Sequence, residues 1–512
     1  MSGLALLGLV MLVVMIGVIF VGFPISFTLL FLALTFGYFG LGEVVFSLAY
    51  FQTIGMMKEE LLAAVPLFIF MGFITEQAGL MERLFVAFRM LLAPLRGALF
   101  YVVILTAAVF AMATGIVGAA ATVLGIMASP IMVKTGYNGS LSAGAITAGG
   151  TLGILIPPSV MLIVMGPVLG VSVADLYAAA FGPGFLLAGL YIAYLATRCF
   201  FDPRLGPPVP KSERVSSLYV LLREVVVGVV PLIGLIAATL GSILAGLATP
   251  TEASGIGALG AMLLAIAYRK VTMAGLTRAL RSTMATSSMV LLLAVTSNIF
   301  GAVFARLGAA NWITESLLAL PFSPVAMLIM VLCLIFLLGW PFEWPAIILV
   351  FLPIFYPVMD GLRPQLSESL GIAPDMVMVW FGALVAVVLQ TAFLSPPVAM
   401  SAYYLRQVVR EWSLATIYKG MFEFMSLQVI AIALIVALPA IATWFPEVLQ
   451  EQARSITTEE VEEGVSLEDY QQPGGYGESL RDALKEDREE EQQEEEGAGD
   501  SLEKDELSNT KK

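Results

Sequence analysis

The chain has 512 residues, of which 59% are hydrophobic and 13% are charged. This composition excludes an ordinary soluble domain and is typical of a helical protein that crosses a membrane several times. The sequence contains no histidine, which excludes histidine metal sites and Ser-His-Asp catalysis. The two cysteines, Cys199 and Cys333, are far apart in apolar surroundings, so we expect no disulfide framework.

The net charge of −13 comes from the C-terminal end of the chain. Residues 447–512 hold 22 acidic and 7 basic residues, whereas the preceding 446 residues hold 17 acidic and 19 basic ones. A segment so acidic and so poor in aromatic residues cannot bury a core. We therefore expect a nearly neutral membrane body followed by a disordered acidic tail.

Apolar stretches long enough for membrane helices follow one another along the body. The first, 4–22, has no basic region before it and no clear cleavage site, so we expect a retained helix rather than a signal peptide. The expected spans are 4–22, 24–41, 98–111, 112–133, 141–168, 173–200, 218–246, 249–268, 322–339, 340–359, 376–402 and 422–445.

Two further stretches are charged or polar at both ends and interrupted in the middle. Residues 57–82 are interrupted at Val65-Pro66, and residues 282–310 at Thr296-Ser-Asn298. This pattern predicts two re-entrant hairpins, each with both ends on one side and a tip near the middle of the membrane. The alternative is that each stretch is an ordinary spanning helix.

Adjacent prolines interrupt two other apolar runs, Thr151–Ser159 and Thr391–Val398. Proline removes a backbone donor and disturbs the preceding turn, so each run should be a broken helix. Such a break is tolerated in a membrane only where protein, water or an ion satisfies the freed backbone groups. Ser159 and Ser395 lie at these two breaks and are candidate ligands beside them.

The two breaks belong to a series of features that occur twice in the same order. A glycine-broken span, Thr114-Gly-Ile-Val-Gly118, precedes the first break, and Gly339–Pro345 precedes the second. The order predicts an all-α polytopic membrane protein built from inverted repeats, with binding sites where the halves meet. The expected parts are a first repeat (1–200), a cytoplasmic linker (201–217), a second repeat (218–412), a last membrane helix (413–446) and the acidic tail (447–512).

Oxygen atoms near these interruptions are the candidate ligands. A cage for a hard monovalent cation could form from hydroxyl and amide groups at the second hairpin tip together with carbonyls freed in the broken span. The alternative is that the small residues here only pack helices together. Glu343 lies between two prolines, where a carboxylate is costly unless it meets water or a partner. The candidates are Thr296, Ser297, Asn298, Gly339, Pro341, Glu343 and Pro345 in the second half, and Val65, Pro66, Thr114, Gly115 and Gly118 in the first.

The motif Thr249-Pro-Thr-Glu252 has the pattern of a helix capping box. Together with Ile156-Pro-Pro-Ser159 and Leu389-Gln-Thr-Ala-Phe-Leu-Ser-Pro-Pro397, it gives residues 1–445 a resemblance to a known family. The chain resembles the large membrane subunit (M, or DctM-type) of tripartite ATP-independent periplasmic (TRAP) transporters. The acidic tail lies outside that pattern.

The resemblance implies the fold of the ion-transporter superfamily, with a scaffold and a mobile region that carries two re-entrant hairpins and works as an elevator. It implies sodium-driven symport in a bacterial or archaeal inner membrane. It also implies a small membrane subunit of about four helices and a periplasmic protein that delivers an organic acid.

In that family sodium lies between hairpin tips and neighbouring breaks. These places correspond to Val65–Phe68 with Thr114–Gly118, and to Thr296–Asn298 with Gly339–Pro345. Phe68 thereby joins the candidates, and Ser297, Asn298 and Gly339 are the expected sodium ligands. We expect no enzyme activity, no cofactor besides the coupling Na⁺ and no nucleic-acid partner. A self-sufficient sodium- or proton-coupled organic anion carrier remains the alternative.

Overall fold

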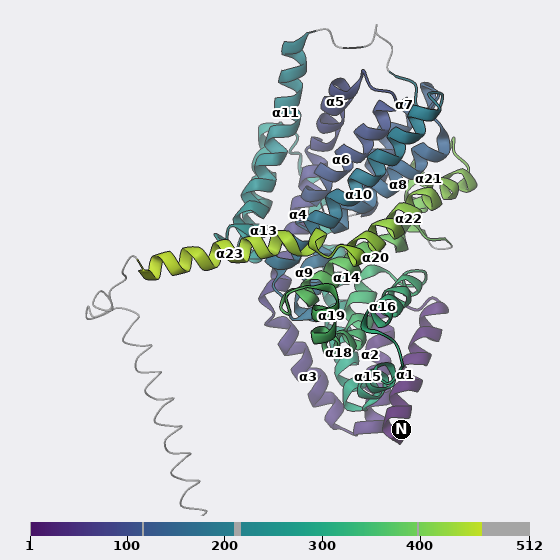
Figure 1. The fold of residues 1–512 in the computed structure, drawn as a ribbon, viewed down its shortest axis with the longest axis vertical. Helices are drawn as coiled ribbons and strands as arrows, with labels where there is room; N and C mark the ends of the chain where they lie inside the picture. The colour runs from purple at the N-terminus through teal and green to yellow at the C-terminus, as the bar shows by residue number, and fades with distance from the viewer. Residues whose placement is uncertain (1, 115–116, 209–213, 215–216, 397–398, 463–512) are drawn as a thin grey trace, which may run out of the picture. The chain divides into compact units, whose positions relative to one another are not determined.

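The computed structural model describes residues 2–114, 117–208, 214, 217–396 and 399–462. The chain divides into two compact units, Met1–Glu447 and Val448–Lys512. The described part of the second unit is the C-terminal portion of one helix, so the fold below is that of the first unit (Figure 1).

Every regular element in the described ranges is a helix. The elements are α1 (Gly3–Phe20), α2 (Ile25–Leu41), α3 (Val44–Met57), η1 (Glu60–Ala63), α4 (Ala64–Gln77), α5 (Leu80–Leu92), α6 (Ala98–Thr114), α7 (Val117–Lys134), α8 (Gly139–Leu155), α9 (Val160–Leu169), α10 (Val173–Phe201), α11 (Leu218–Ile236), η3 (Ala237–Gly241), α12 (Ser242–Leu244), α13 (Pro250–Ala267), α14 (Met273–Arg306), α15 (Ala309–Leu318), α16 (Pro324–Leu338), α17 (Trp344–Ala346), η4 (Ile347–Phe351), α18 (Leu352–Gly361), α19 (Arg363–Leu370), α20 (Met376–Leu394), α21 (Met400–Val408), α22 (Leu414–Ala437) and α23 (Ala440–Glu462).

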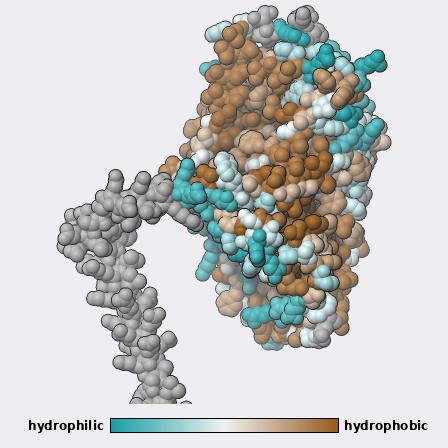
Figure 2. Space-filling model, viewed as in Figure 1, coloured by the Kyte–Doolittle hydropathy of each residue, from teal (hydrophilic) through white to brown (hydrophobic). Residues whose placement is uncertain are grey.

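Nine helices of the described residues are long and apolar enough to cross a membrane, and the bent pair α8–α9 would add a tenth. Hydrophobic residues cover much of the outer face in Figure 2, as expected of a surface that meets lipid. The span in α20 is 94% buried, so this helix lies inside the unit. Both cysteines are free, as the sequence indicates.

The hairpin expected over 282–310 is not present. Residues 273–306 form one continuous helix of 34 residues, α14, which passes through Thr296, Ser297 and Asn298 without a break. The hydroxyl of Thr296 donates to the carbonyl of Leu292 at 2.9 Å, so the helix accommodates this polar side chain by bonding it to its own backbone.

The prediction of a hairpin over 57–82 is also wrong. α3 ends at Met57, and a second helical run extends from Glu60 to Gln77, long enough to cross a membrane on its own. Pro66 is the third residue of α4, in a first turn where a missing backbone N–H is tolerated. The stretch is therefore the ordinary spanning helix that the sequence left open.

The chain does double back between α6 and α7. A Cβ atom added to Gly149 of α8 would lie 3.1 Å from the Cβ of Ala107, and one added to Gly150 would lie 2.9 Å from the Cβ of Ala121. Ala107 and Ala121 therefore contact neighbouring residues of α8, although 13 residues lie between them in the chain. In a straight helix these two alanines would be roughly 20 Å apart. α6 and α7 form a helical hairpin, where the sequence indicated two successive spans.

Both Pro-Pro runs are broken helices, as predicted. α8 ends at Leu155, and α9 begins at Val160 with a bend of 46°. α20 ends at Leu394, and α21 begins at Met400; residues 397–398 lie outside the described part.

The two halves contact each other reciprocally. α8 packs against α22, and α20, which like α8 ends at a Pro-Pro run, packs against α10. α10 and α22 have the same place in the two halves, since each is the second helix after a Pro-Pro break. Figure 1 shows α8, α10 and α22 close together in the upper part of the unit. Reciprocal contacts of this kind are what a two-fold relation between repeats produces.

One boundary differs from the sequence prediction. The last helix, expected over 413–446, is two helices, α22 and α23, because Pro439 follows the end of α22 and cannot continue it. The expected linker, 201–217, lies partly outside the described residues.

Candidate functional site

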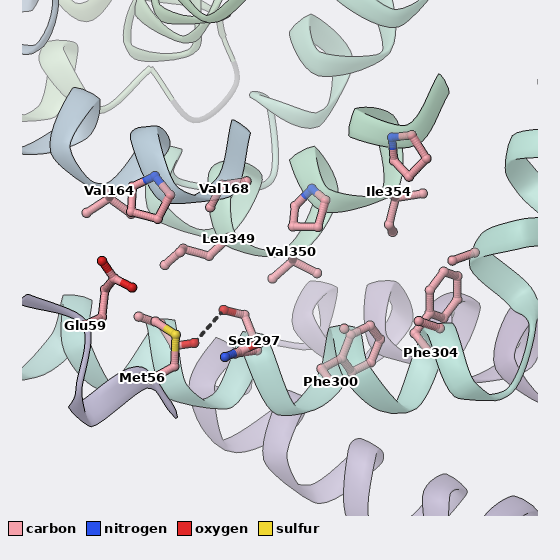
Figure 3. A pocket seen from close by; sticks show the side chains of 18 of the residues that line it. Met56, Glu59, Val164, Val168, Ser297, Phe300, Phe304, Leu349, Val350 and Ile354 are labelled. Carbon is pink, nitrogen blue, oxygen red and sulfur yellow. Dashed lines mark hydrogen bonds between the residues drawn. The ribbon is translucent and has the colours of Figure 1, made fainter. Parts of the chain in front are cut away.

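A cavity of about 510 Å³ lies beside α14. One wall is α14, with the end of α3 next to it, and the opposite wall is α9 with η4 and α18 (Figure 3). α9 follows the first Pro-Pro break, and η4 and α18 follow the turn after α16. The cavity thus lies between the continuous helix α14 and three elements that follow a break or turn in the chain, α9 in the first half and η4 with α18 in the second.

The lining is mostly apolar, with Leu349, Val350, Phe300 and Phe304 among its larger side chains (Figure 3). Four described lining residues carry a polar side chain, and they are Glu59, Ser297, Asn298 and Asn311. A concave, largely apolar site with a few polar groups is the usual form of a small-molecule site.

Two predicted site residues, Ser297 and Asn298, line this cavity. The Ser297 hydroxyl donates to the carbonyl of Leu293 at 2.7 Å and lies 3.1 Å from that of Ala294. Its lone pairs stay available to a cation or to a donor in the cavity. Thr296 is buried and is not part of the lining.

The predicted residues of α4 lie elsewhere. Val65 and Phe68 are buried in the hydrophobic core, and neither they nor Pro66 line the cavity. Gly115 lies outside the described residues, as do the surroundings of Thr114 and Gly118.

The predicted residues between α16 and α17 form a separate group. Gly339 packs against α20, where an added Cβ would lie 2.7 Å from the Cβ of Ala392. Pro345 is buried in α17, Pro341 is half-buried and Glu343 is exposed at the start of α17. α17 contacts both α14 and α9, but none of these four residues lines the cavity.

Ser159 and Ser395 have the same role at the two breaks. The Ser159 hydroxyl donates to the carbonyl of Ile154 at 2.5 Å, and the Ser395 hydroxyl donates to that of Thr391 at 2.6 Å. Both serines are buried. Each satisfies a carbonyl in the last turn of the preceding helix, which stabilises the break without water.

The capping box at the start of α13 is confirmed. The Thr249 hydroxyl accepts from the Glu252 amide at 3.2 Å, and the Glu252 carboxylate accepts from the Thr249 amide at 2.8 Å. Thr251, inside the same motif, donates its hydroxyl to the carbonyl of Glu60 at 3.3 Å. The motif thereby anchors the turn that precedes α4, a contact between the halves that the sequence did not reveal.

Sequence reasoning missed Glu59 and Asn311. In the sequence, Glu59 is one of the charges at the start of the stretch 57–82. The signal that could have found it is a carboxylate placed directly before a long apolar run, in a turn between two membrane helices.

A second polar group is buried between the broken helices and their neighbours. The Gln428 amide donates to the Thr151 hydroxyl at 3.5 Å. Gln390, fully buried on α20, has no hydrogen-bond partner for either amide atom among the residues that the structure describes. A buried amide without a partner is costly, so this position suits an ordered water or a bound polar group.

The family described as "Tripartite ATP-independent periplasmic transporter, DctM component" matches residues 12–441. The chain belongs to this family. It is the DctM-type large membrane subunit of a TRAP transporter, a multi-pass protein of the inner membrane.

Two curated relatives align with this chain over most of their own length. The large permease protein SiaM of a sialic acid TRAP transporter from Vibrio cholerae is 28% identical over 434 residues, which cover 84% of this chain and 96% of SiaM. The large permease protein DctM of a C4-dicarboxylate TRAP transporter from Rhodobacter capsulatus is 27% identical over 466 residues, which cover 88% of this chain and all of DctM.

Solved transporters share the fold. The Alcanivorax borkumensis YdaH transporter aligns with a TM-score of 0.54 at 16% identity, over 79% of this chain and 90% of YdaH. Neisseria gonorrhoeae MtrF aligns with a TM-score of 0.52 at 15% identity, over 77% of this chain and 84% of MtrF. These likenesses extend to the fold alone.

Proposed function

We propose that this DctM-type subunit belongs to a sodium-coupled secondary transporter that imports a small carboxylate. In this proposal a periplasmic binding protein delivers the acid, and a small membrane subunit of about four helices binds the chain. The observation that carries the proposal is the family match over residues 12–441, which spans both repeats and both breaks. The chain performs no catalysis in this proposal.

The position of the cavity supports an elevator mechanism. α14 is continuous over 34 residues and suits a fixed wall. α9, η4 and α18 follow interruptions in the chain and belong to the elements that the repeats share. In the proposed mechanism these elements move past α14 and carry the ligand between the two sides of the membrane.

The proposed ion ligands lie at two separate places. Ser297 and Asn298 offer side-chain oxygens to the cavity, whereas the carbonyl of Gly339 lies in the turn that packs on α20. Oxygen atoms are the ligands that hard cations prefer. We therefore propose that Gly339 contributes to a sodium site distinct from the one that Ser297 and Asn298 would serve.

The test is uptake into proteoliposomes that contain this chain, its small membrane subunit and its binding protein. Labelled probes would include sialic acid and succinate, because relatives are named for sialic acid and C4-dicarboxylates. The proposal predicts uptake of one organic acid that disappears when either partner is omitted. Equal uptake by this chain alone would contradict it and would indicate the self-sufficient carrier.

A further inference from the structure

Glu59 is the one charged side chain among the described residues that line the cavity. In Figure 3 its carboxylate points toward Val164 of α9, with the Met56 side chain between Glu59 and Ser297. Lys58 and Glu60, its neighbours in sequence, do not line the cavity. A ligand in this space therefore meets one carboxylate and no positive side chain among the described lining residues.

The backbone of this turn is anchored from the other half of the chain. Glu59 has an extended backbone (φ −70°, ψ 103°) between α3 and η1. The next residue, Glu60, accepts the Thr251 hydroxyl at 3.3 Å from the N-terminus of α13. That N-terminus is itself held by the capping box of Thr249 and Glu252. The turn that carries Glu59 is thus tied to the N-terminus of α13 through its backbone.

The cavity is elongated along α14. Lining residues extend from Ala294 to Ala305, which corresponds to roughly 16 Å of helix. Glu59 lies near the Ser297 end (Figure 3). Asn311, whose amide can donate to an anion, follows the C-terminal end of α14 and so belongs to the opposite end.

This arrangement distinguishes ligands by their charge. A monoanion can place its carboxylate toward Asn311 and its apolar body against Phe300, Phe304 and Leu349. A dianion anchored in the same way at Asn311 places its second carboxylate at the end of the molecule nearer Glu59. Like charges repel strongly in a partly desolvated space, whereas well-separated charges interact weakly.

We propose that Glu59 is a specificity-determining residue that restricts the cavity to organic acids with one carboxylate and an apolar body. The proposal rests on the proposed function, the transport of a carboxylate. It makes no use of the sodium sites.

The test compares two acids of equal chain length, heptanoate and heptanedioate, as probes. Their dissociation constants are measured on the purified full-length chain with its small subunit in nanodiscs, for wild type, Glu59→Gln and Glu60→Gln. Glu60→Gln is the matched control because it removes the same charge one residue away, from an exposed side chain outside the lining. Thermal unfolding confirms that each variant is folded.

We expect wild type to bind heptanoate at least tenfold more tightly than heptanedioate. Glu59→Gln should reduce that preference at least fivefold, mainly by improving the binding of heptanedioate, and Glu60→Gln should keep it. An unchanged preference in Glu59→Gln, or an equal loss in Glu60→Gln, would overturn the proposal. If neither probe binds while the complete transporter still takes up another acid, the assignment of Glu59 fails and the proposed function stands.

Discussion

The crossing of α8 and α22 gives a direct stability prediction, because the two backbones touch at Gly420. A Cβ added there would lie 2.0 Å from the carbonyl oxygen of Ser140 and 2.8 Å from the backbone nitrogen of Gly144. Ordinary contacts of a Cβ begin at about 3.4 Å, and neither obstructing atom is on a side chain that could rotate away. In Gly420→Ala the two helices must separate by more than about 1 Å, which loosens the packing along the whole crossing.

Overpacking of this kind costs about 1–3 kcal/mol. The matched control is Gly255→Ala on α13, where an added Cβ meets no atom within 4 Å. There, removing a flexible glycine from a helix should stabilise the protein by up to about 1 kcal/mol. Thermal unfolding of the purified variants should therefore move in opposite directions. Equal stability of Gly420→Ala and wild type would refute the close crossing of α8 and α22.

Three further predictions concern other parts of the chain. Thr249→Ala should destabilise the protein by about 1 kcal/mol, because it removes the cap of α13, while Thr249→Ser should retain stability; equal melting temperatures for both variants would contradict the capping role. Asn298→Ala should raise the sodium concentration needed for half-maximal uptake, at unchanged expression. The control is Ser288→Ala, at an exposed position of the same helix, and an equal effect of this variant would show that the cavity is not involved. Deleting residues 463–512 should leave transport intact, because their composition is that of an acidic tail outside the family match, and loss of uptake with normal insertion would show otherwise.

The sequence predicted the elements whose signal is local. Composition and apolar spans identified a polytopic helical protein, and both Pro-Pro runs are broken helices as expected. The capping box at Thr249 was also correct, since its bonds join residues three positions apart. Each of these signals depends on residues that are neighbours in the chain.

The hairpins were misplaced because their local signals are ambiguous. Thr296, Ser297 and Asn298 look like a polar tip, yet a helix accommodates such hydroxyls by bonding them to its own carbonyls. The true doubling back, between α6 and α7, becomes visible only when Ala107 and Ala121 both meet α8. That is a contact between distant residues, which periodicity does not report.

The candidate site was predicted in part for the same reason. Ser297 and Asn298 line the cavity although the hairpin that suggested them is absent. Gly339 belongs to another contact, with Ala392 of α20. Glu59 was missed because the other residues that line the cavity with it, such as Val164 and Ser297, are far away in the sequence.

The central claim is that a sodium gradient drives the import of an organic acid through this subunit. The most direct test is the initial rate of uptake by the complete reconstituted transporter under an inward sodium gradient, under equal sodium on both sides, and under a proton gradient without sodium. The account predicts accumulation under the inward sodium gradient alone. Accumulation of the acid to the same level without sodium would contradict it.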